Sequence, residues 1–91
     1  MALVLCEVHP GVGAVATSVA VRDTSDVRTF LAVEREFLTQ RRGRQYLPVG
    51  VVHIDPRSKA VLVELPHEAD SGANRLWVRA ADLLEAIEAL A

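Results

Sequence analysis

The stretch YLPVGVVHIDPRSKAVLVEL, residues 46–65, decides the fold class of this chain. Apolar side chains alternate along 46–54, and β-branched residues return over 60–65, which is typical of two strands. Between them, Asp55 and Pro56 occupy the first two positions of a type I turn. We therefore predict a β-hairpin over residues 46–65.

Pro48 and Gly50 interrupt the first strand of this hairpin. Because proline has no N–H to donate to a neighbouring strand, we expect an exposed edge or a bulge at Pro48. Gly50 indicates a bend, as at the corner of a β-barrel. The strand is therefore predicted to be kinked.

The preceding part of the chain also has the pattern of short strands. Residues 2–8 form a nearly continuous apolar run that ends at a His-Pro-Gly break over 9–11. From residue 12 to 22, β-branched residues recur with a period of two. A polar turn over 23–26 separates this strand from the next, at 27–33.

The connections after residue 33 are less uniform. Residues 34–38 fit either a bulge that continues the strand or one helical turn. The chain should reverse around 40–43, where Gly43 can adopt a positive φ. A polar loop over 66–73 then leads into a last strand at 74–79.

The C-terminal segment has a helical pattern. Asp82 and Glu85, three residues apart, form a potential capping box at the start of a short helix over about 82–90. Its apolar stripe consists of Leu83, Leu84, Ile87 and Leu90.

These elements predict a mostly β protein: a single domain over residues 1–91, folded as a small antiparallel barrel of five to six strands with a short C-terminal α-helix. Closure of the barrel would remove the sheet edges that invite aggregation.

The order of elements over 44–84 resembles that of SH3-like small barrels. The resemblance rests on the run at 49–52, the turn at 55–58, the strand at 60–65, and a strand that leads into Asp82. PRC-barrel domains and the plasmid-borne small-barrel dihydrofolate reductases are similar in spacing. The reductases' Val-Gln-Ile-Tyr is replaced here by Arg75-Leu76-Trp77-Val78, so no catalytic role is carried over.

Composition limits the function classes. The chain is 51% hydrophobic, which excludes intrinsic disorder, and its formal charge of −2 provides no overall attraction to nucleic acid or anionic membranes. A single cysteine excludes a disulfide framework, and no apolar run approaches the ~20 residues of a membrane span. We expect a cytoplasmic protein with a reduced thiol and no membrane partner. Because so small a domain has many aliphatic residues, we also expect a homo-oligomer.

The last strand presents the first candidate contact surface. If Leu76 and Val78 face the core, the only tryptophan faces outward between two arginines, and these residue types are enriched in interface hot spots. Alternatively, the C-terminal helix folds over the indole. The loop that precedes this strand, over 66–74, adds polar side chains without an EF-hand spacing, so we expect it to contact a partner rather than a metal. The candidate partner-binding residues are Arg75, Trp77, Arg79, His67, Asp70 and Asn74.

A second candidate surface is the basic cluster at the predicted reversal. Arginines at a hairpin tip can contact phosphates, and a nearby tyrosine can stack on bases. Alternatively, the cluster is a solvated turn, partly neutralised by Glu34 and Glu36. The candidate nucleic-acid-binding residues are Arg41, Arg42, Arg44 and Tyr46.

No residue pattern indicates catalysis. Cys6 lies in an apolar run and is most simply a buried residue, and its spacing from His9 points the two side chains to opposite faces of a strand. The sequence has no phosphate-binding glycine loop and no paired acid and base. We therefore expect no enzyme, no metal and no cofactor, but a non-enzymatic protein-interaction or scaffold module. The alternatives are a nucleic-acid-binding barrel and an enzyme whose site is shared across an oligomer.

Overall fold

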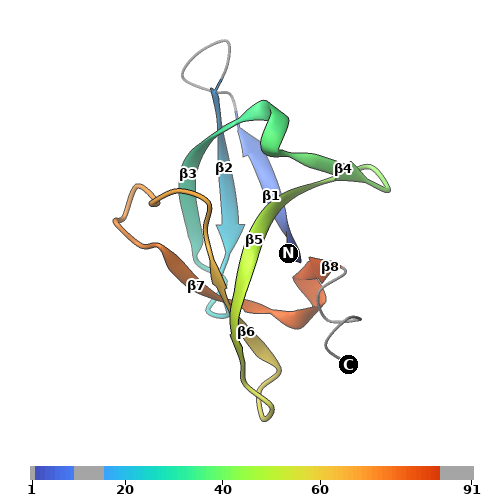
Figure 1. Ribbon diagram of the computed structural model, residues 1–91, viewed down its shortest axis with the longest axis vertical. Coiled ribbons are helices and arrows are strands. Elements are labelled where there is room, and N and C mark those ends of the chain that lie inside the picture. Colours follow the sequence, from blue (N-terminus) through green and yellow to red (C-terminus); the bar gives the residue numbers. More distant parts are fainter. Residues whose placement is uncertain (1, 10–15, 85–91) are drawn as a thin grey trace.

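The computed structural model describes residues 2–9 and 16–84, which form a mostly β, antiparallel half-barrel (Figure 1). The strands follow the order β3-β2-β1-β5-β6-β7, while β4 pairs with β5 and β8 pairs with β1. The elements are β1 Ala2–His9, β2 Ala16–Arg22, β3 Arg28–Glu34, η1 Arg35–Phe37, β4 Thr39–Arg41, β5 Arg44–Ile54, β6 Ala60–Glu64, β7 Arg75–Arg79, η2 Ala80–Asp82 and β8 Leu83–Leu84.

Strand β5 curls the sheet, because its main partner changes along its length; β4 pairs only with its first residues, 44–46. Up to Val49, β5 pairs with β1, and from Gly50 onward it pairs with β6. A further irregularity lies between Val51 and His53, where the register with β6 shifts. Figure 1 shows β5 as a long curved strand across the molecule. The hairpin predicted over 46–65 is confirmed, and the change of partner falls where proline and glycine indicated a bend.

Strand β1 is central and is buried on both of its faces. Ala2 and Val4 point into the core at 0% exposure, yet Leu3, on the opposite face, is only 8% exposed. Continuous apolar runs are typical of strands covered on both sides. The first part of the N-terminal run is therefore enclosed on both faces, whereas Val8 near its end is 45% exposed.

The turn between β2 and β3 is held by its own aspartates. The Oδ1 atom of Asp23 accepts hydrogen bonds from the backbone N–H groups of Ser25 (2.8 Å) and Val27 (3.0 Å). Asp26 adopts φ 65°, a left-handed conformation that aspartate tolerates better than most residues. This turn projects as a rigid corner toward β7.

Two backbone hydrogen bonds tie the outer strands to turns: the β2–β3 turn bonds to β7, and the loop over 66–74 bonds to β3. The Thr24 N–H donates to the carbonyl of Trp77 (2.9 Å), and the Asp70 N–H donates to the carbonyl of Phe30 (2.9 Å). The β2–β3 turn and the loop over 66–74 thus cover the seam that the sheet leaves open.

The core is aliphatic and comes from nearly every strand. Fully burying a valine or leucine side chain stabilises a fold by about 1.5–3 kcal/mol, so nine large residues at under 2% exposure supply much of the driving force. They are Leu31, Leu47, Val4, Val19, Val21, Val33, Val61, Val63 and Val78.

The predicted C-terminal helix is wrong in the part that the structure describes. Asp82 ends η2, and Leu83 and Leu84 form strand β8 opposite Val4 and Leu3 of β1. Leu83 is 6% exposed in this position, so pairing with β1 satisfies its backbone and buries its side chain at once. Residues 85–90 of that prediction lie outside the described residues.

Two other expectations are settled in part. Of the two alternatives for 34–38, the helical turn is correct: η1 is a single 3-10 turn after β3. The strand predicted from residue 12 is seen from Ala16, and 12–15 lie outside the described residues. Across residues 2–9 and 16–84, no helical segment has the length and apolarity needed to cross a membrane.

Candidate functional site

The outward face of β7 carries the most exposed aromatic residue of the described structure. Val78 points inward at 0% exposure, whereas Trp77 keeps 39% of its surface exposed. Arg75 and Arg79 lie two residues before and after Trp77, on the same face of the strand, and both are exposed. The strand therefore presents all three predicted residues on one face, with the indole between the two arginines.

The surroundings of Trp77 are mixed apolar and aromatic. Across the sheet it lies opposite Leu62, which in turn lies opposite His53. The His53 imidazole meets the indole edge-on, with ring centroids 6.1 Å apart and planes at 88°. The aromatic neighbour of the indole is therefore an imidazole from β5. Val52, which precedes His53 at the register shift of β5, is also 39% exposed.

A groove of about 680 Å³ lies beside this tryptophan. Three turns surround it: the β2–β3 turn at Thr24, the β5–β6 turn at 55–59, and η2 at 80–81. Trp77 and Arg79 complete its lining, together with the small side chain of Ala60. We call this the Trp77 groove.

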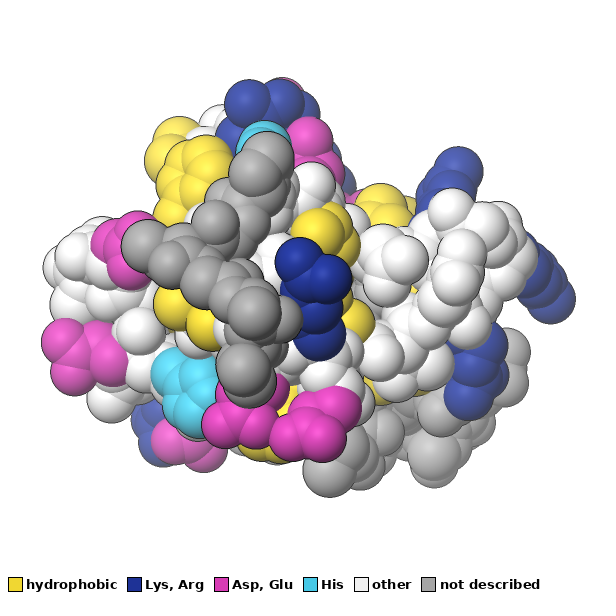
Figure 2. All heavy atoms as spheres, turned by 90° about the horizontal axis from the view of Figure 1, so that it is seen from above, with side chains coloured by type: hydrophobic (Ala, Val, Ile, Leu, Met, Phe, Trp, Pro, Cys, Tyr) yellow, Lys and Arg dark blue, Asp and Glu magenta, His cyan; other side chains and the backbone are white. Residues whose placement is uncertain are grey.

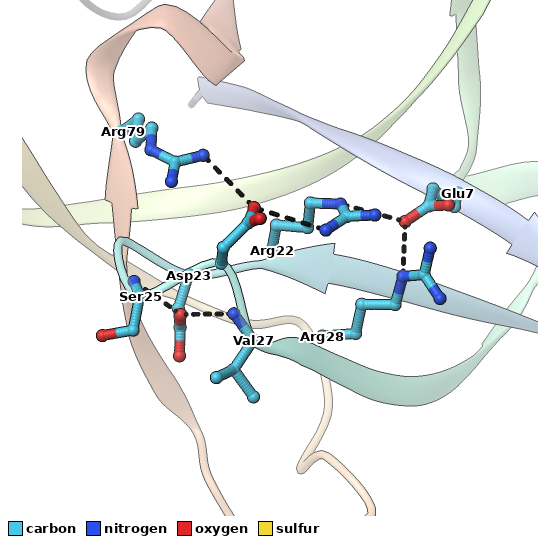
Figure 3. Close-up of polar contacts among 8 residues, drawn as sticks. Glu7, Arg22, Asp23, Ser25, Val27, Arg28 and Arg79 are labelled. Carbon is cyan, nitrogen blue, oxygen red and sulfur yellow. Dashed lines mark hydrogen bonds and ion pairs between the residues drawn. The ribbon is translucent and has the colours of Figure 1, made fainter.

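Hydrogen bonds and ion pairs hold the β2–β3 turn against β7. Besides the bond between Thr24 and Trp77, the Asp26 carboxylate lies 3.3 Å from Arg22 and 3.5 Å from Arg79. Figure 3 shows Arg79 reaching from β7 toward this turn, while Arg22 also approaches Glu7. The wall of the groove is thus fixed by contacts from three strands.

The opposite wall is the tight β5–β6 turn. The Asp55 carboxylate accepts hydrogen bonds from the Arg57 backbone N–H (3.0 Å) and the Ser58 hydroxyl (2.8 Å), and the first of these is the main reason that its pKa is lowered. The Lys59 N–H donates to the Asp55 carbonyl (2.9 Å), and Lys59 has φ 60°. A lysine therefore occupies a left-handed position at the rim of the groove.

The loop over 66–74 lies away from this groove. The His67 ring packs 5.7 Å from Phe37 of η1, and the backbone of Asp70 bonds to β3. The Asn74 carbonyl accepts from the Leu65 N–H (2.8 Å), which closes the base of the loop. His67, Asp70 and Asn74 do not line the Trp77 groove, so the structure separates them from the arginines and tryptophan of β7.

A second, apolar groove of about 510 Å³ adjoins that loop. Phe37 forms one wall, Leu65 and Pro66 the other, and Pro48 and Gly50 lie between them. Nothing in the sequence pattern marked these residues as neighbours, because they come from η1, β5 and the end of β6.

The basic hairpin β4–β5 projects from the molecule (Figure 1). Its two-residue turn has positive φ at Arg42 (53°) and Gly43 (77°), and Arg41 lies directly opposite Arg44. Figure 2 shows Lys and Arg side chains gathered on the side where this hairpin projects. Tyr46, however, is only 7% exposed, so its ring is not presented beside the arginines for stacking on a base.

The carboxyl groups of Glu34 and Glu36 interact with each other. A hydrogen bond from one side chain to the other, together with the charge of Glu34, raises the pKa of Glu36. Both residues are exposed, at the end of β3 and in η1.

The remaining reactive groups are poorly placed for chemistry. Cys6 is 6% exposed, and burial raises the pKa of its thiol to about 11, so almost no thiolate forms at neutral pH. Over residues 2–9 and 16–84, no three His, Cys, Asp or Glu side chains come together as metal ligands would.

Of the residues that line the Trp77 groove, the sequence analysis named Trp77 and Arg79 but not Lys59, Asp55 or Thr24. The Asp-Pro-Arg-Ser turn at 55–58 could have indicated Asp55 and Lys59, because the hairpin that it closes pairs through β6 with β7, which carries Trp77. Comparison of the chain with protein-family models, with curated proteins and with solved structures finds no match in any of the three.

Proposed function

We propose that this chain is a non-enzymatic protein-interaction module with an SH3-like small-barrel architecture, and that it binds its partner in the Trp77 groove. In this proposal, Trp77 is the apolar anchor, and Arg75 and Arg79 flank it. The module works in the cytoplasm and binds a segment of another protein or of a second copy.

The exposed indole carries the proposal. The uncovered 39% of Trp77 corresponds to roughly 100 Å², and burying that area is worth about 2.5 kcal/mol. The walls of the groove are held by hydrogen bonds, so little conformational entropy is lost when a partner docks. A rigid tryptophan between arginines is the composition that interface hot spots favour.

The strand order supports the SH3-like part of the proposal. Strand β5 is shared between two parts of the sheet, and β1 pairs with both β5 and β8. The single 3-10 turn η2 then connects β7 to the short last strand. Of these elements, the β5–β6 hairpin and β7 are the ones on which the resemblance of residues 44–84 to small barrels rests.

A displayed library of random dodecapeptides tests this function. The library is selected on the native chain, and bound peptides are then measured against Trp77→Thr, which keeps a β-favouring residue in the strand. Phe37→Thr is the matched control, because Phe37 is 37% exposed and lines the separate apolar groove.

Two results are decisive. The proposal predicts peptides whose affinity falls at least about tenfold in Trp77→Thr and is unchanged in Phe37→Thr, with native circular dichroism in both variants. Failure to enrich any peptide, or peptides that bind Trp77→Thr as well as the native chain, overturns it.

A further inference from the structure

We propose that the Trp77 groove takes an acidic segment of a partner protein, with a carboxylate between Lys59 and Arg79 and a neighbouring apolar side chain on the indole. This inference rests on the proposed function and adds the chemistry of the partner.

The register of the sheet brings the two cations to one place. Lys59 directly precedes Ala60, and Ala60 lies opposite Arg79 in the pairing of β6 with β7. Both cationic side chains line the groove, and Ala60 between them is too small to fill the space. A carboxylate placed over Ala60 can accept hydrogen bonds from an ammonium and a guanidinium together, and such charge-assisted bonds are the strong ones.

The carboxylates already present are engaged elsewhere. Asp55 accepts two hydrogen bonds within its own turn, and Asp26 is shared between Arg22 and Arg79. Within the described part of the chain, Lys59 forms no ion pair. The lining of the groove therefore carries two cations, Lys59 and Arg79, against one carboxylate, Asp55, on a chain whose formal charge is −2.

Arg79 can exchange its partner for a ligand. Its contact with Asp26 is 3.5 Å long, and the two side chains are 48% and 57% exposed. Ion pairs this exposed contribute little to stability, because water screens them and the side chains lose entropy. Replacing this contact by a bond to a ligand carboxylate is therefore nearly neutral for the fold.

The backbone of Lys59 adds a second observation, although the turn residues Asp26 and Arg42 share its positive φ outside the groove lining. Its φ of 60° lies in the region where glycine is favoured and a β-carbon is strained. Strain of this kind is concentrated at functional sites, where the side chain is needed in spite of it. A glycine would suit the turn, but only a cationic side chain provides charge at the rim of the groove.

A protein segment fits this site better than nucleic acid does. A phosphate backbone carries a charge at every nucleotide, whereas the lining of the groove supplies only two cations. One carboxylate next to an apolar side chain matches two cations beside one tryptophan.

The test compares synthetic peptides of one sequence in two forms. The probe is an enriched library dodecapeptide that contains Asp or Glu, labelled with fluorescein. The comparison peptide has the same sequence with every Asp and Glu replaced by Asn and Gln. Anisotropy is measured with the native chain, Lys59→Glu and Arg57→Glu. The last variant makes the same charge change on the same turn at a residue that does not line the groove. An oligothymidylate probe measures binding to nucleic acid, and sedimentation of the chain alone measures its self-association.

We expect the acidic peptide to bind at least about tenfold more tightly than its amide form, and more weakly as salt rises. Lys59→Glu should weaken the acidic peptide by more than about tenfold, and Arg57→Glu by less than about threefold. If neutral or basic peptides bind equally well and still require Trp77, the partner chemistry is wrong while the proposed function stands. Absence of any peptide binding overturns both. Preferred binding of the oligonucleotide, or a groove occupied by a second copy at the concentrations used, overturns the choice of partner.

Discussion

Replacing Lys59 tests whether this residue lowers the stability of the fold while it contributes positive charge to the groove. Lys59 has φ 60°, and a residue with a β-carbon in this conformation costs roughly 1–2 kcal/mol. A glycine avoids this cost but has more conformational freedom in the unfolded chain, so the net gain in stability is about 1 kcal/mol. Lys59→Gly should therefore raise the free energy of unfolding by about 1 kcal/mol, or the Tm by about 4–8 °C in a domain of this size. The same variant should bind the acidic peptide at least about tenfold more weakly.

Urea denaturation followed by the emission of the single tryptophan measures the first effect. Lys59→Ala is the control, because it removes the charge but keeps the β-carbon at positive φ, so its stability should stay within about 0.5 kcal/mol of the native chain. A Lys59→Gly variant that is no more stable than Lys59→Ala would refute the reasoning. A stabilised variant with unchanged peptide affinity would show that the lysine is not retained for binding.

Three further outcomes follow from the fold. Burial that raises the pKa of Cys6 to about 11 leaves roughly a hundredfold less thiolate at pH 8 than in the unfolded chain, so Ellman's reagent should label the native protein at least that much more slowly than in urea. Leu47→Ala, at a 0% exposed position, should lower the free energy of unfolding by about 2–5 kcal/mol in the same urea titration. Because the pKa of Asp55 is lowered in the folded state, its contribution to stability is complete above the unfolded pKa of about 3.9 and is lost as the pH falls through the folded pKa. Asp55→Asn should therefore reduce the loss of stability between neutral and acidic pH. An unchanged pH dependence would contradict this.

Alternation of apolar and polar residues accounts for how well the strands could be predicted. Val78 is fully buried and Trp77 exposed because a strand turns successive side chains to opposite faces, and that period is visible in the sequence. The turn chemistry was equally local: Asp55 and Pro56 marked one reversal, and Gly43 marked another.

Long-range pairing explains what could not be predicted. The spacing of Leu83 and Leu84 suits a helix, but the unpaired edge of β1 offered both backbone partners and burial, and β8 formed instead. Likewise, the Trp77 groove joins turns that are distant in sequence, so Lys59 gained its role only when β6 and β7 paired. The loop residues His67 and Asp70 lie shortly before β7 in the sequence. In the structure, however, His67 contacts η1 and Asp70 bonds to β3.

Amide chemical-shift mapping tests the central claim most directly. In ¹⁵N-labelled protein titrated with the acidic peptide, we predict the largest shifts at Lys59, Ala80 and the Trp77 indole N–H, with little change at Phe37 and Arg42. Shifts centred on the β4–β5 hairpin or on the groove at Phe37, with the Trp77 indole unmoved, would contradict the account.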